Sequence, residues 1–154
     1  MVNTESFLVD GDFAAWRILH DVLTYAVESG AFGDGSLQER LMDAFIACEI
    51  ERLLQERNQR MTQGEQILGY EDEQTAWLRP RLAGRLRGII EDIVGPLALL
   101  ASSEAHAPAD GVLGKHLQQC IDLQFGEDGG QDETAILAQA LGLVEQAASA
   151  SIAG

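Results

Sequence analysis

The chain has 154 residues, 46% of them apolar, which is enough for one hydrophobic core without disulfides or metals. It carries 25 acidic residues against 10 basic ones, a formal net charge of −15. Because nucleic-acid binding depends on neutralising phosphates, this balance disfavours direct binding to DNA, RNA or anionic lipid. Three explanations of the acidity stay open: solubility, adaptation to high salt, and recognition of a basic partner.

The N-terminal part predicts one helix behind a loose end. Residues 1–11 show no helical apolar spacing, and we expect them to form a flexible terminus. The apolar residues that follow recur at helical spacing over 13–27, and Asp12 is placed to cap that helix. Three glycines between positions 30 and 35 then break the chain.

A long second helix is predicted over 37–60. Ser36 and Glu39 form a capping-box pattern, in which each side chain satisfies a backbone donor of the other. The apolar stripe of this helix starts at Leu37 and continues around the cylinder through four further residues, Ile46, Ile50, Leu53 and Leu54. The last stretch, 55–60, is wholly polar, so we expect it to extend into solvent or to contact something outside the domain.

The third predicted helix begins near Asp72 or Glu73 and carries a proline. Pro80 predicts either a kink or a restart of the helix, because proline lacks the backbone N–H and is favoured in the first turn. Gly95 and Pro96 end or bend the helix, and a short helix over 96–101 can follow.

Two more helices complete the chain, over 112–125 and 133–150, with a frayed end at 149–154. No alternating strand pattern and no internal repeat is visible. The sequence therefore predicts an all-α fold, a compact bundle of five to six helices in a single domain spanning 1–154.

Candidate partner-binding residues lie in three places. The polar end of the second helix offers Glu56, Arg57 and Arg60. Arg81 and Arg85 are one helical turn apart, in a stretch where glycines at 84 and 88 are expected to leave the backbone accessible; the alternative is pairing within this acidic chain. The third candidate is an acidic pair in the glycine-rich turn 126–130, formed by Glu127 and Asp128.

A pocket between helices is the alternative kind of site. Its candidate residues are His20, Glu49 and His116, although each also has a structural interpretation as a buried or salt-bridged side chain. His116 and Cys120 share a helix face, but zinc requires three or four ligands and no further cluster supplies them. We therefore predict no metal, no cofactor and no catalytic residue.

The two cysteines, Cys48 and Cys120, lie in apolar helical surroundings and predict buried free thiols in a reducing compartment. The acidic N-terminus is unlike a signal peptide, and the longest uncharged apolar run is too short to span a bilayer. These features favour a cytoplasmic protein without membrane contact.

The leading hypothesis is a non-enzymatic interaction protein, acting as an inhibitor, adaptor or assembly factor, that docks on a basic surface of a partner protein. That partner could be a nucleic-acid-handling machine, and such proteins often come from phages or mobile elements. One alternative is a ligand-binding or enzymatic bundle with a pocket between helices. A second is a structural subunit of a homo-oligomer joined through the alanine-rich last helix.

Overall fold

The structure, a computed structural model, describes residues 14–66, 69–99, 107–125 and 133–143. Within these ranges it contains five α-helices and no strand, which confirms the predicted all-α bundle. The helices are α1 (Ala15–Glu28), α2 (Gly35–Gln63), α3 (Glu71–Val94), α4 (Val112–Phe125) and α5 (Glu133–Ala140). Short 3-10 turns cover Ala31–Gly33, Gly95–Leu99 and Pro108–Gly111.

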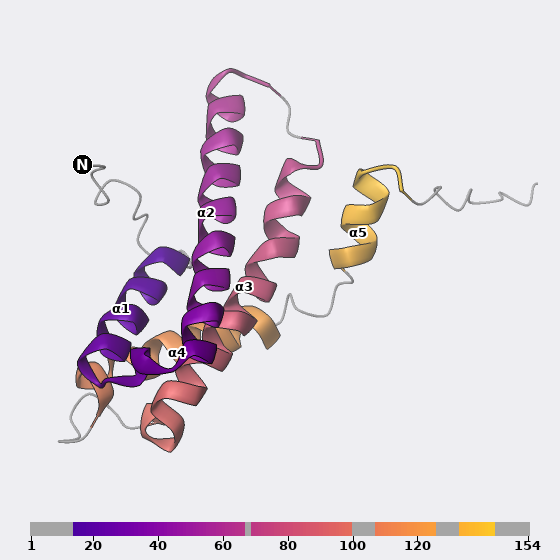
Figure 1. Cartoon of the computed structure of the whole chain (residues 1–154). Helices are drawn as coiled ribbons and strands as arrows, with labels where there is room; N and C mark the ends of the chain where they lie inside the picture. Colours follow the sequence, from indigo (N-terminus) through magenta and orange to yellow (C-terminus); the bar gives the residue numbers. More distant parts are fainter. Residues whose placement is uncertain (1–13, 67–68, 100–106, 126–132, 144–154) are drawn as a thin grey trace, which may run out of the picture.

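Helix α3 is the centre of the bundle, because it packs against α1, α2, α4 and α5. Figure 1 shows α2 and α3 as a long helical hairpin whose upper half extends beyond α1 and α4, with α5 beside α3. The core lies at the lower half, where apolar residues at helical spacing are buried. These include Ile18, Leu19 and Val22 of α1, Leu41 and Cys48 of α2, Leu82, Leu86, Ile89 and Ile90 of α3, and Leu113 and Cys120 of α4.

Helix α2 begins two residues before the predicted start, and a different residue caps it. The Asp34 side chain accepts a hydrogen bond from the Ser36 backbone N–H at 2.9 Å, and the helix starts at Gly35. The predicted capping box of Ser36 and Glu39 is therefore wrong. An aspartate at the N-cap satisfies the same orphan backbone donors, and it lies two positions earlier in the chain.

Helix α3 runs through Pro80 without restarting. The proline removes one backbone hydrogen bond of the helix, yet Leu82 and Ala83, two and three residues after it, are fully buried. Packing of this apolar face outweighs the local cost of the proline, so of the two predicted outcomes, a kink or a restart, the restart does not occur.

Helix α5 is shorter than the helix predicted over 133–150. It ends at Ala140, and Gly142 follows with a left-handed backbone, φ +68°. The backbone N–H of Leu143 donates to the Ala138 carbonyl at 2.9 Å, which is the closing bond of a glycine-terminated helix. The predicted loose ends, 1–11 and 149–154, lie outside the described residues.

Among the helices that the structure describes, none combines the length and apolarity needed to cross a membrane.

Candidate protein-interaction surface

The most unusual surface feature is an apolar row on the outer side of α2. Four large side chains recur every three or four residues and are about half exposed: Met42 (59%), Ile46 (50%), Ile50 (47%) and Leu53 (53%). We call these four residues the α2 row. Isolated exposed apolar residues are ordinary, but a contiguous row over successive helical turns is typical of an interaction surface.

An aromatic pair borders the α2 row where α1 meets α2. The Trp16 and Phe45 rings stand edge to face, with centroids 5.1 Å apart and planes at 89°. Phe45 itself is 41% exposed, so its ring widens the apolar surface toward α1. Edge-to-face aromatic contacts are favourable, and this one holds the border of the row in a fixed position.

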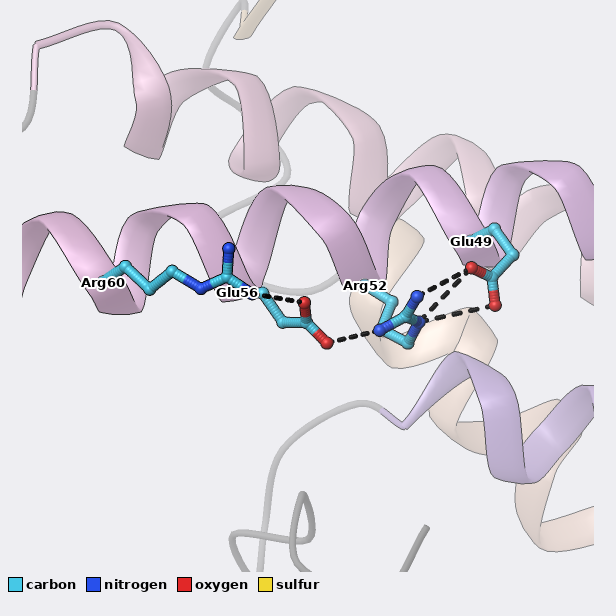
Figure 2. Close-up of polar contacts among 4 residues, drawn as sticks. All are labelled: Glu49, Arg52, Glu56 and Arg60. Carbon is cyan, nitrogen blue, oxygen red and sulfur yellow. Dashed lines mark hydrogen bonds and ion pairs between the residues drawn. The ribbon is translucent and has the colours of Figure 1, made fainter. Parts of the chain in front are cut away.

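A ladder of ion pairs runs along α2 through Glu49, Arg52, Glu56 and Arg60, as Figure 2 shows. Arg52 bonds to Glu49 at 3.0 Å and also to Glu56, and Arg60 bonds to the second oxygen of Glu56 at 3.3 Å. The hydrogen bonds that Arg52 donates to Glu49 raise the pKa of Arg52 above its ordinary value. Two carboxylates and two guanidiniums neutralise each other here, so the ladder carries no net formal charge.

The polar end of α2 contacts α3 rather than only solvent. Arg57 bonds to the buried Glu71 at 3.2 Å, and the Asn58 amide donates to the Glu71 carbonyl and to the Thr75 hydroxyl. Glu71 also accepts the backbone N–H of Gly69 at 2.8 Å. The expected projection of 55–60 away from the domain is thus wrong for this side of the helix, although Arg57 and Arg60 stay largely exposed.

A buried ion pair joins the middle of α2 to α3. Glu51 is 3% exposed, and its Oε1 accepts from Arg79 Nε at 3.0 Å and from Gln55 Nε2 at 2.8 Å. This pair fixes the rotation of α2 about its own axis. With Glu51 turned toward α3, the α2 row on the opposite side must face outward.

Charge changes sign along the exposed face of α2. Glu39 and Asp43 are exposed near its N-terminal end, and within the described part of the chain neither makes an ion pair. Arg57 and Arg60 lie at the C-terminal end, where they pair with Glu71 and Glu56 of the same chain. The whole helix carries five acidic residues and four arginines, a net charge of −1 in a chain of net charge −15.

The three pocket candidates do not converge on one cavity. His116 is buried between α1 and α4, where its Nε2 lies 2.7 Å from Asp21 Oδ2. His20 is largely exposed and faces the other oxygen of Asp21 at 3.4 Å. Glu49 belongs to the ion-pair ladder on α2. The residues that the structure describes include no cluster of three or more histidine, cysteine or acidic side chains able to hold a metal ion.

The arginine stretch of α3 is partly used within the chain. The Arg81 guanidinium stacks 4.0 Å from the centre of the Trp77 ring and donates to the Thr134 hydroxyl of α5 at 3.0 Å. Arg85 is exposed. The expected access to the glycine backbone is wrong, because a Cβ on Gly84 would lie 2.6 Å from Gln124 of α4. The Arg40 side chain likewise lies over Gly88.

Glu127 and Asp128 lie outside the described residues.

Both cysteines are fully buried free thiols. Burial raises the pKa of the Cys48 thiol to about 12, with a further contribution from the negative charges of Glu51 and Glu49. Burial likewise raises the pKa of the Cys120 thiol to about 12, partly offset by Arg87. Neither thiol is available as a nucleophile at neutral pH.

Taken together, the fold and the surface define an all-α bundle with an outward-facing apolar row. Its fold is similar to the solved structures of the Tcur3481-Tcur3483 steroid ACAD, an acyl-CoA dehydrogenase, and of its G363A variant. The TM-scores are 0.64 and 0.63 at 20% and 19% sequence identity, over 84% of this chain. The match spans about a third of those chains, 33% and 34% of their length. No family model and no curated protein matches the sequence. At this identity, the likeness is one of fold.

Proposed function

We propose that this chain is a non-enzymatic protein-interaction module that docks through the exposed face of α2. The observation that carries the proposal is the α2 row, four large apolar side chains held half in water over successive turns of one rigid helix. A long, well-anchored helix presents such a row without reorganisation, which lowers the entropic cost of binding.

The size of the apolar contribution supports docking. Completing the burial of a half-exposed Ile, Leu or Met contributes about 1 kcal/mol, so the α2 row offers roughly 4 kcal/mol to a complementary surface. Phe45 and its partner Trp16 add an aromatic border of the kind enriched at binding hot spots.

The partner in this proposal has a basic surface, which would meet the two acids near the N-terminal end of α2. Glu39 and Asp43 lie beside the N-terminal end of the α2 row on the same exposed side of the helix and have no cation of their own among the described residues. Cationic groups on a docking partner would complement them and set its orientation.

The test is affinity capture from a lysate of the source organism with the wild-type chain, Ile50→Glu and Val27→Glu. Val27 is the matched control, because it is 62% exposed but lies at the end of α1 away from the α2 row. We expect the wild-type chain and Val27→Glu to capture the same partner protein, and we expect Ile50→Glu to lose it. Equal retention of every captured protein by all three chains would contradict it.

A further inference from the structure

The exposed face of α2 has a regular pattern that the α2 row alone does not show. Seven exposed positions alternate at spacings of four and three residues: Glu39, Asp43, Ile46, Ile50, Leu53, Arg57 and Arg60. This is the heptad spacing at which two helices pack along a common seam. Along the seam the chemistry runs from two acids, through three apolar residues, to two arginines.

The exposed face of one α2 helix is complementary in charge and apolarity to the same face of a second copy that runs in the opposite direction. If two copies of α2 pack antiparallel about a two-fold axis level with position 48, Ile46 lies opposite Ile50 of the partner subunit. Glu39 then lies opposite Arg57 of the partner subunit, and both contacts occur twice by symmetry. A parallel pairing would instead place acids on acids and arginines on arginines.

The large negative charge of the chain does not forbid this contact. Helix α2 has a net charge of −1, and the ladder beside the row neutralises Glu49 and Glu56 with Arg52 and Arg60. Bringing the α2 helices of two copies together therefore adds little electrostatic repulsion beyond the repulsion between the two whole chains. The acids that carry the remaining charge lie on other parts of the sequence.

We infer that the occupant of the α2 face is a second copy of this chain, joined through an antiparallel α2–α2 seam. The inference rests on the proposed function and names its partner: the cationic group that meets Glu39 is Arg57 of the partner subunit, at the C-terminal end of its α2. The weakest contact along the seam is the one between Asp43 and Leu53 of the partner subunit, because it sets a charged side chain against an apolar one. One helix pair buries an area at the lower end of specific interfaces, so the dimer dissociates in the micromolar range.

Sedimentation velocity on the purified full-length chain, from about 1 to 500 µM, measures the dissociation constant. We expect a monomer–dimer equilibrium, with the constant raised at least tenfold by Ile50→Glu and unchanged by Val27→Glu. Circular dichroism on each variant confirms that the bundle is folded. A wild-type monomer throughout the range, or a dimer unaffected by Ile50→Glu, would overturn the inference.

The direction of the helices is tested by cross-linking. Glu39→Cys and Arg57→Cys chains are oxidised separately and as an equimolar mixture, while Cys48 and Cys120 are buried and stay unreacted. The antiparallel seam predicts a mixed disulfide, because positions 39 of the two copies would lie about 27 Å apart along the axis. Predominant disulfides between identical variants would refute the antiparallel arrangement.

The two proposals fail separately. A monomeric chain whose capture of another protein is abolished by Ile50→Glu refutes the self-association and leaves the interaction module standing. A dimer that depends on Ile50 supports both.

Discussion

Removing Glu51 should destabilise the fold more than any other single charge change on α2. Its buried carboxylate receives Arg79 from α3 and Gln55 from the next turn of its own helix. Glu51→Ala removes both bonds and leaves the guanidinium of Arg79, 26% exposed, without this carboxylate. A hydrogen bond to a charged group contributes about 1.5–3 kcal/mol, so we expect a loss of about 3 kcal/mol in the free energy of unfolding. For a domain of this size the melting temperature should fall by roughly 6–12 °C.

Urea unfolding followed by circular dichroism at 222 nm measures the effect in Glu51→Ala, Arg79→Met and the double variant. Because Glu51 and Arg79 act as a pair, the double variant should lose clearly less than the sum of the two single losses. Glu51→Gln keeps the volume and one acceptor, and should cost less than Glu51→Ala. Additive losses, or a loss below about 0.5 kcal/mol for Glu51→Ala, would refute the role given to this pair in fixing the rotation of α2.

Three further predictions concern the core and its polar contacts. The two cysteines, each with a pKa of about 12 against 9.0 for a free thiol, should not react with a disulfide reagent at about pH 8 in the native protein, and both should react in denaturant. The free energy of unfolding should accordingly fall between about pH 9 and pH 12, where only the unfolded chain releases these protons. Pro80→Ala should raise the free energy of unfolding by about 1–3 kcal/mol in urea titration by restoring a helix bond; a decrease would mean that the proline shapes the packing of α3. Asp21→Asn should lower it by about 1–2 kcal/mol through its contact with His116, whereas substitution of the exposed His20 should change little.

The helices were predictable because their apolar residues repeat at the helical period. The fourth helix has the predicted bounds, Val112–Phe125, since a turn precedes it and a glycine-rich segment follows it in the sequence. The ends of α2 and α5 were not predicted correctly. Several residues near each end can cap or terminate a helix, and the choice between Asp34 and Ser36 depends on small differences in backbone geometry.

The proposed interaction surface was only partly visible in the sequence. Ile46, Ile50 and Leu53 were expected to continue the apolar stripe around the helix, but the sequence does not say whether another helix covers them. That depends on which side of α2 meets α3, and the choice is made by contacts such as Glu51 with Arg79, 28 positions apart. The four-and-three spacing with acids at one end and arginines at the other was available from the sequence and is the signal that could have suggested the proposed seam.

The response to salt separates the two kinds of partner that this surface could meet. A complex with a basic protein is held by complementary charge over a wide area, so added salt weakens it. Two copies of this chain, each with a net charge of −15, repel one another at long range, and salt screens that repulsion while the apolar centre of the seam is unaffected. The dissociation constant of the dimer should therefore fall several-fold as the ionic strength rises from about 10 to 150 mM. Sedimentation velocity at these two ionic strengths detects the change. A dimer that dissociates over this range would show that charge pairs such as Glu39 with Arg57 of the partner subunit, and not the α2 row, provide most of the binding energy.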